Sequence, residues 1–194
     1  MADLNVALIG LLGVMAGGYV NNFLAEDYRR FRDGQALAGA LAGELESHGE
    51  AFPILKSGLE GMMPAALSEE GLKLNEWPIP PSPLFEENAA KIGLLGAEAA
   101  RDVAYVYENI RAFRQNFHML SKSHREMPKE WSHAMIIGCL ATISRAETRG
   151  RPLIDTLKRQ ATGAYWNRQQ TRTQLKYGAA ALFAFLVVLK VFGL

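Results

Sequence analysis

Arg111 and His118, in the stretch RAFRQNFH, are the two residues whose types and spacing come nearest to a catalytic pair. They are seven positions apart, so a helix places both side chains on one face, about two turns from each other. An arginine can stabilise the charge of a phosphate, and a histidine can take the proton of a ribose 2′-hydroxyl. The pair therefore points to RNA cleavage as the chemistry to consider.

This pair resembles that of the HEPN ribonucleases, which are helical bundles with a closely spaced arginine and histidine. Six residues lie between Arg111 and His118, which is at the edge of that pattern, and the polar Asn116 is nearby. The resemblance implies a membrane-tethered, HEPN-like ribonuclease as one alternative for the function. A solvated arginine with a histidine at the helix edge, or an interface pair, gives the same spacing, and we expect no catalytic role.

Other catalytic and ligand-binding motifs are absent from the sequence, which has no glycine-rich phosphate loop, no GxSxG and no HExxH. His48, His124 and His133 are not spaced with each other or with acids as a metal-ligand set. His48 lies on an apolar stripe and is expected to be a core histidine with satisfied hydrogen bonds. A single cysteine, Cys139, excludes a cysteine-based zinc site. We therefore predict no cofactor and no metal, and lean towards a protein that is not an enzyme.

Small residues at helical spacing suggest a second kind of site, a face for helix packing. Gly13 and Gly17 form a GxxxG pair with Gly10 nearby, and Ala180 and Ala184 repeat the spacing near the other end of the chain. Small residues let helix backbones approach closely in lipid. We predict that these five residues form a packing interface, and glycines placed there by chance are the alternative.

Residues 4–25 form the first of two apolar segments, and these 22 residues carry no formal charge. A helix of this length is about 30 Å long, which is enough to cross the hydrocarbon core of a bilayer. No lysine or arginine precedes the segment, whereas a cleaved signal peptide needs a positive start. We therefore predict a transmembrane helix over residues 4–25, with a buried soluble helix as the alternative.

Residues 177–194 form the second apolar segment, whose only charge is Lys190. A basic run precedes it, made up of Lys158, Arg159, Arg168, Arg172 and Lys176. Such residues bind anionic headgroups on the cytoplasmic side of a span. The same run could bind nucleic acid with Tyr165 and Trp166 as stacking rings, but the membrane accounts for it more simply. We predict a transmembrane helix over residues 177–194, with a C-terminal core helix as the alternative, and basic residues at the membrane surface.

The topology follows from the basic residues at both segments. Arg29, Arg30 and Arg32 follow the first segment, and positive residues mark the cytoplasmic side. The prediction is a protein of the inner (plasma) membrane with residues 26–176 in the cytoplasm and both termini outside. The lone cysteine agrees with a reducing compartment.

Apolar residues at spacings of three and four predict that the central region is all-α. One stripe runs through residues 35–60, where Pro53 should kink or break the helix. Residues 61–83 contain WPIPPSP and predict a proline-rich connection. A short helix should open at Ser82-Pro83, followed by a cleaner helix over residues 97–121. From Trp131 a seven-residue repeat continues to Ala164 and predicts one long helix towards the second segment. The predicted fold is a helical bundle flanked by transmembrane helices.

The charge of the chain is divided unevenly along its length. Residues 1–100 carry 14 acidic and 6 basic side chains, whereas residues 101–194 carry 6 acidic and 15 basic ones. The two halves should attract each other, or the basic half should face an anion. A net charge of +1 and 49% hydrophobic residues exclude a disordered tail and a wholly basic nucleic-acid coat.

The stretch PSPLFEENAAKIGLL at 81–95, followed by AARDVAYVYENIRAF, resembles many uncharacterised bacterial proteins. Those proteins pair an N-terminal membrane anchor with a small helical cytoplasmic domain, and the resemblance covers roughly residues 4–160. It implies no activity. We therefore expect a non-enzymatic integral membrane protein that self-associates as an assembly, scaffold or pore-type effector. The alternative is an accessory subunit of a larger membrane complex. The expected partners are the lipid bilayer and either further copies of the chain or that complex, and nucleic acid is not expected.

Overall fold

The computed structural model describes residues 10, 13–14, 17–18 and 24–191, and every regular element among them is a helix. The prediction of an all-α protein is confirmed for this part of the chain. The elements follow in order as α2 (Ala25–Leu67), α3 (Pro83–Asn88), η2 (Ala89–Leu95), α4 (Ala97–Ser123), α5 (Lys129–Thr162), η3 (Tyr165–Asn167) and α6 (Gln169–Val191).

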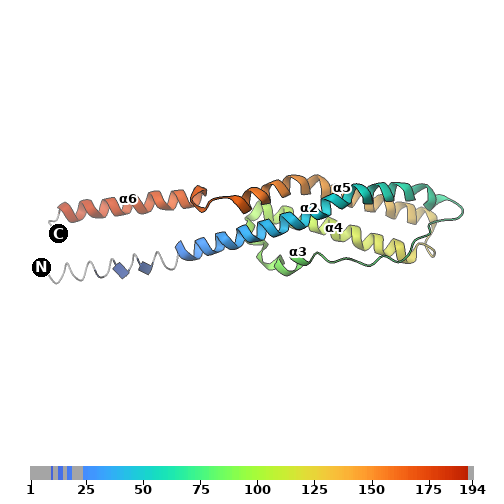
Figure 1. Cartoon of the computed structure of the whole chain (residues 1–194), viewed down its shortest axis with the longest axis horizontal. Coiled ribbons are helices and arrows are strands. Elements are labelled where there is room, and N and C mark those ends of the chain that lie inside the picture. The colour runs from blue at the N-terminus through green and yellow to red at the C-terminus, as the bar shows by residue number, and fades with distance from the viewer. Residues whose placement is uncertain (1–9, 11–12, 15–16, 19–23, 192–194) are drawn as a thin grey trace. The chain divides into compact units, whose positions relative to one another are not determined.

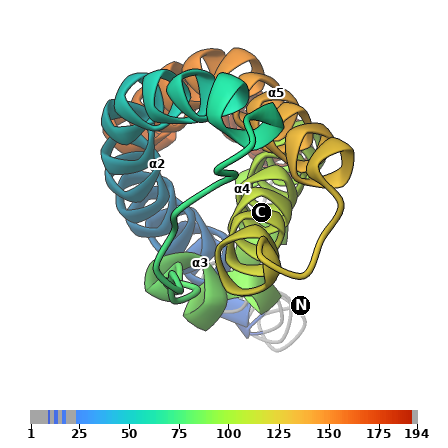
Figure 2. The same cartoon turned by 90° about the vertical axis from the view of Figure 1, so that its right-hand side faces the viewer.

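The chain divides into two compact units. The bundle unit comprises Gly34–Ala161, and the terminal unit comprises Met1–Asp33 together with Thr162–Leu194. Within the bundle unit, α2 and α4 run in the same direction and α5 runs opposite to both (Figure 1). Viewed along their length, these three long helices surround a common interior (Figure 2).

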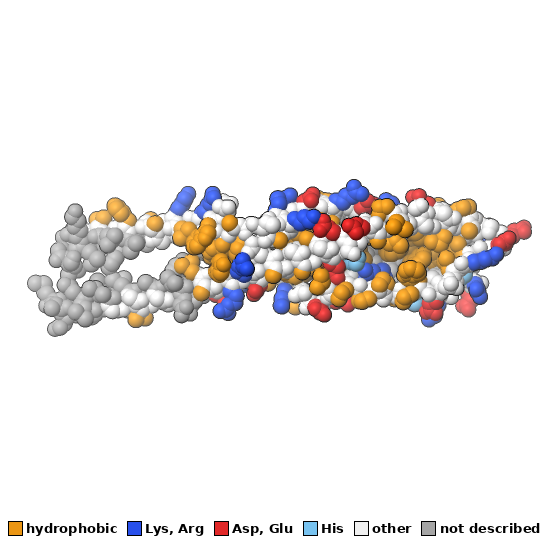
Figure 3. All heavy atoms as spheres, in the orientation of Figure 1, with side chains coloured by type: hydrophobic (Ala, Val, Ile, Leu, Met, Phe, Trp, Pro, Cys, Tyr) orange, Lys and Arg blue, Asp and Glu red, His pale blue; other side chains and the backbone are white. Residues whose placement is uncertain are grey.

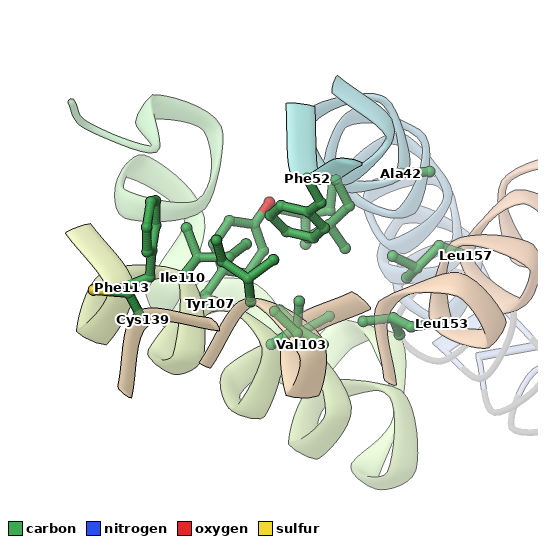
Figure 4. Close-up of a cluster of buried hydrophobic side chains, with 14 of the residues drawn as sticks. Ala42, Phe52, Val103, Tyr107, Ile110, Phe113, Cys139, Leu153 and Leu157 are labelled. Atoms are coloured by element: carbon green, nitrogen blue, oxygen red, sulfur yellow. The ribbon is translucent and has the colours of Figure 1, made fainter. Parts of the chain in front are cut away.

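The bundle core is built from the three apolar stripes that the sequence predicts. Figure 4 shows side chains from α2, α4 and α5 pointing towards one another, with Phe52, Ile110 and Leu157 among them. The residues that are at most 1% exposed include Leu41, Leu59, Val103, Val106, Leu120, Ile136, Cys139, Ile143 and Leu157. Full burial of one such aliphatic side chain contributes about 1.5–3 kcal/mol, so these stripes account for most of what holds the bundle together.

Residues 68–82, which we call the strap, connect α2 to α3 in an extended conformation that returns along the bundle (Figure 1). Side chains of α4 and of His124, which directly follows α4, anchor it by binding its backbone. The backbone N–H of Trp77 donates to Ser121 Oγ at 2.9 Å, and that of Leu74 donates to His124 Nε2 at 3.4 Å. The strap needs these partners because an extended segment, here with three prolines, forms no regular backbone hydrogen bonds of its own.

Two boundary predictions differ from the structure. The proline-rich connection begins at Ser68, not at Gly61, because α2 continues through Pro53 and Pro64. Both prolines lie on the exposed side of the helix, where water can satisfy the carbonyl groups that they leave free. Burial on the opposite face offsets the cost of about 3 kcal/mol for an interior proline.

The end of α5 is the second difference. The helix contains Pro152, as predicted, but it ends at Thr162, and a short turn and η3 separate it from α6. Ala164 is therefore exposed and outside the helix. The seven-residue repeat holds only as far as Leu157, which is the last residue of α5 that the bundle fully buries.

The predicted transmembrane segment 4–25 lies largely outside the described residues. For the described part of the chain, no helix is both long enough and apolar enough to cross a membrane.

Candidate functional site

In the terminal unit, a junction of aromatic and charged residues joins the start of α2 to η3 and the residue that follows it. Tyr165 of η3 is 6% exposed, and its hydroxyl donates a 2.8 Å hydrogen bond to Asp27 Oδ2 at the start of α2. Arg168 Nη1 lies 3.5 Å from the same carboxylate oxygen. Burial and the hydrogen bond to Asp27 raise the pKa of Tyr165, so this hydroxyl stays protonated and remains a donor at neutral pH.

Aromatic rings surround Tyr165 in this junction. Its ring centroid is 5.3 Å from those of Tyr28, Phe31 and Trp166, distances typical of favourable ring pairs. The guanidinium of Arg168 lies 5.4 Å from the centre of the Phe31 ring, within the range of a cation–π interaction. Trp166 is 64% exposed and Tyr28 is 48% exposed. The junction therefore presents amphipathic rings and cations together.

The five basic residues predicted at the membrane surface are divided between the two units. Lys158 and Arg159 belong to the bundle unit, where Lys158 pairs with Glu46 of α2 and Arg159 Nη2 donates to Thr156 Oγ1 at 3.0 Å. Arg168, Arg172 and Lys176 belong to the terminal unit.

Arg172 is held close to the junction by two hydrogen bonds. Its Nη2 donates to Asn167 Oδ1 at 3.1 Å, and its Nε donates to the Trp166 carbonyl at 3.3 Å. Of the five predicted residues, Arg168, Arg172 and the exposed Lys176 share a unit with the apolar segments.

The small-residue faces are accessible where the structure describes them. Gly10, Gly13 and Gly17 are helical and exposed, and a Cβ added to any of them would meet no described atom within 4 Å. Ala180 is also exposed, whereas the side chain of Ala184 lies outside the described residues. Among the residues that the structure describes, none occupies the space beside these glycines.

Arg111 and His118 lie on α4, but each binds a different partner. Arg111 Nη2 forms an exposed 2.8 Å ion pair with Glu108, one turn away. His118 Nδ1 lies 2.7 Å from the carbonyl oxygen of Trp77 in the strap. The histidine therefore helps to hold the strap on α4 as an N–H donor.

A partly buried polar cluster lies between α2, α3 and α4, and the sequence pattern does not predict it. The Glu44 carboxylate accepts hydrogen bonds from the backbone N–H groups of Leu84 and Phe85, both at 3.1 Å, and from the Tyr107 hydroxyl at 2.6 Å. It thus caps the N-terminus of α3 from another helix, where a negative charge suits the helix dipole. Acidic residues on α2 gave no signal of this role, because the contact depends on where α3 lies.

Arg114 completes this cluster. Its Nη1 donates to Ser82 Oγ at 2.7 Å, and its Nη2 lies 3.5 Å from His48 Nε2. Burial and the positive charge of Arg114 lower the pKa of His48, and burial with Glu44 as acceptor raises that of Tyr107. Ser82 is only 3% exposed, so a substrate has no access to its hydroxyl. The cluster fixes α3 and the end of the strap.

Neither a search for metal-binding side chains nor comparison with known proteins identifies a further site among the described residues. Within the described ranges, no group of three or more His, Cys, Asp or Glu side chains is arranged to hold a metal ion. The chain matches no protein-family model, no curated protein and no solved structure.

Proposed function

We propose that this chain is a non-enzymatic integral membrane protein that is anchored by both of its ends, keeps its helical bundle in the cytoplasm and self-associates. The observation that carries the proposal is the junction. Asp27 lies two residues after the apolar segment 4–25, and Tyr165 and Arg168 precede the apolar segment 177–194, Arg168 by nine residues. Their hydrogen bond and ion pair hold the two entry points together. Two segments that start side by side would enter the bilayer from the same face.

The chemistry of the junction suits the surface of a membrane. Tyrosine and tryptophan are enriched at the headgroup level, where one end of the ring is apolar and the other is wet. Trp166 and Tyr28 are exposed beside Arg168 and Arg172, whose cations can bind anionic headgroups. The terminal unit therefore combines the two residue classes that position a span in a bilayer.

Self-association rests on the open glycine face. Lipid tails are as apolar as leucine, so helices in a bilayer associate through close packing, which small residues permit. Gly10, Gly13 and Gly17 meet no described atom that would occupy such a face. A second copy of the same segment supplies a surface of matching shape.

The experiment that tests the anchoring is cysteine labelling in intact bacterial cells with a membrane-impermeant maleimide. Ala2→Cys and Leu194→Cys should react from outside, and Ser68→Cys in the strap should react only after cell lysis. The wild-type chain is the matched control, because Cys139 is buried and burial raises its pKa to about 12, which leaves it unreactive in the folded protein.

Two results would contradict the proposal. Extraction of the wild-type chain from the membrane fraction by alkaline carbonate would exclude spanning segments. Labelling of Ser68→Cys in intact cells would exclude a cytoplasmic bundle.

An accessory subunit of a larger membrane complex is the second candidate, and exposed apolar side chains on the bundle favour it. Trp131 is 65% exposed, Trp77 is 54% exposed and Ile79 is 49% exposed. Figure 3 shows hydrophobic side chains gathered over the end of the bundle where α2 ends and α5 begins. Tryptophan is enriched at the energetic centres of interfaces. Pull-down from native membranes separates the candidates, since a stable heteromeric partner that is lost in Trp131→Ser favours the subunit.

A further inference from the structure

A hollow of about 500 Å³ lies on the bundle between α4 and α5, away from the partly buried polar cluster. Its lining is unusually basic and comprises Arg101, Asp102 and Tyr105 of α4 with Ser144, Arg145, Thr148 and Arg149 of α5. Three arginines and one aspartate give this lining a formal charge of +2. Concentrated positive charge in a concave surface attracts anions more strongly than the same charge on a flat one.

The buried side-chain amide of Asn109 positions Arg145. Asn109 is 9% exposed, its Nδ2 donates to the Tyr105 carbonyl at 2.9 Å, and its Oδ1 accepts from Arg145 Nε at 2.9 Å. The structure gives the two Nη groups of Arg145 no partner among the residues that it describes. The guanidinium is thus oriented through one nitrogen and retains the two-pronged edge that binds an oxyanion.

Arg149 lies one turn further along α5 and is fixed in a similar way. Its Nη2 donates to Asp102 Oδ1 at 2.9 Å, and Arg101 Nε lies 3.4 Å from the same oxygen. A single carboxylate therefore serves two of the three arginines. Like charges four residues apart on a helix destabilise it by a few tenths of a kcal/mol, and an anion in the hollow would relieve that repulsion.

We propose that this hollow binds a phosphate monoester through Arg145 and Arg149. A phosphate monoester carries a charge of about −1.5 to −2 at neutral pH, which matches the +2 of the lining. Its three terminal oxygens can accept from both guanidiniums and from the hydroxyl group of Ser144, whereas the Thr148 hydroxyl already donates to the Ser144 carbonyl at 2.7 Å. The Tyr105 side chain, which is 44% exposed at the hollow, provides a surface for the group that carries the phosphate.

The phosphate monoester can belong to a soluble molecule or to a lipid headgroup, and two probes distinguish these sources. Phenyl phosphate tests a soluble ligand by titration calorimetry of the full chain in mild detergent. Vesicles with phosphatidic acid, a monoester, are compared with vesicles of phosphatidylglycerol, a diester, to test a lipid. Binding of phenyl phosphate assigns the soluble source, and binding that is specific to phosphatidic acid vesicles assigns the lipid.

Arg145→Gln should weaken the binding of either probe at least tenfold, and Arg145→Lys should weaken it almost as much, because lysine loses the planar fork and the bond to Asn109. Arg151→Gln is the matched control: it removes the same charge from the same helix, but Arg151 pairs with Glu147 outside the hollow. Its affinity should stay within twofold of the wild type.

Circular dichroism of each variant establishes that it folds, and Arg149→Gln replaces Arg145→Gln if the latter does not. Absence of binding by both probes would overturn the proposal. An equal loss of affinity in Arg151→Gln would also overturn it, because the binding would then depend on net charge alone.

Discussion

His48 makes the stability of the bundle depend on pH. Burial and Arg114 lower its pKa below the ordinary value of 6.5, and the negative charge of Glu44 opposes them only in part. The unfolded chain therefore binds a proton more readily than the folded chain, so stability falls as the pH drops below about 6.5. When the pH is lowered from 7.5 to 5.5, the melting temperature of His48→Gln, measured by circular dichroism, should fall less than that of the wild type.

The control for this prediction is His133→Gln, which changes a histidine on α5 that has no part in the cluster. It should leave the wild-type pH dependence intact. A His48→Gln variant that loses as much melting temperature on acidification as the wild type would show that the histidine does not cause the effect.

Arg111 and His118 should have no role in RNA cleavage, because each already serves a structural contact. Purified protein should leave single-stranded RNA intact, as judged on a denaturing gel. His118→Ala should lower the free energy of unfolding by about 1 kcal/mol, the usual net contribution of one hydrogen bond, since it removes the contact to the Trp77 carbonyl. If the wild type cleaves RNA and a folded His118→Ala variant does not, the ribonuclease hypothesis is correct instead.

At the residue scale, the sequence predicts buried apolar positions better than polar partners. A helical period alone predicts the burial of Val103, Val106 and Ile110, because their burial depends on which face of one helix they occupy. Glu44 and Arg114 carry no such signal. Their partners, Ser82 and the backbone of α3, lie 32 or more positions away in the chain, and only the path of the strap brings them together.

At the scale of elements, Gly34 marks a close approach that restricts α2. A Cβ added there would lie 3.1 Å from the carbonyl oxygen of Leu94 in η2, so a larger side chain has no room. Gly34→Leu should destabilise the bundle by about 1–3 kcal/mol, as overpacking generally does. Thermal or urea denaturation of the full chain in a fixed detergent measures the change.

Gly43 on the same helix supplies the matched control. A Cβ at Gly43 would meet no described atom within 4 Å, and leucine improves helix propensity over glycine by up to about 1 kcal/mol. Gly43→Leu should therefore be neutral or stabilising. Equal losses of stability in the two variants would mean that the contact with η2 does not restrict the position.

The strap shows what an element's sequence specifies and what it leaves open. The run WPIPPSP predicts an extended segment, because proline fixes its own backbone and donates no hydrogen bond. The pattern predicts too early a start for that segment, because exposed prolines do not prevent α2 from continuing when its other face gains burial. That the strap returns along α4 depends on Ser121, His124 and His118 as partners, and these residues show no pattern in the sequence.

At the scale of the whole molecule, some acidic side chains of the first half form ion pairs with basic side chains of the second half. Glu46 of the acidic half pairs with Lys158, and Asp27 pairs with Arg168. The first pair lies in the bundle unit and the second in the terminal unit. The predicted attraction between the two halves of the sequence therefore contributes to the stability of both units. Because exposed ion pairs contribute at most about 1 kcal/mol each, the apolar stripes still dominate the stability.

The open glycine face predicts how the whole molecule associates. Gly13 and Gly17 lie one turn apart on one helical face, and each glycine costs up to about 1 kcal/mol in helix propensity relative to alanine, so their spacing calls for a packing reason. Gly13→Ile with Gly17→Ile should still insert into the membrane but should run at a smaller assembly size in mild detergent, measured by size exclusion with light scattering. The added bulk occupies the space where a neighbouring backbone would lie.

Gly18→Ile is the control, because it adds the same bulk about 100° around the helix from Gly17, and it should keep the wild-type assembly size. If the double variant also keeps the wild-type size and its native partners, the glycine face is not an interface. The first segment would then serve as an anchor alone. Any association would have to come from the bundle, where Trp131 on α5 and Trp77 on the strap are the exposed residues best suited to it.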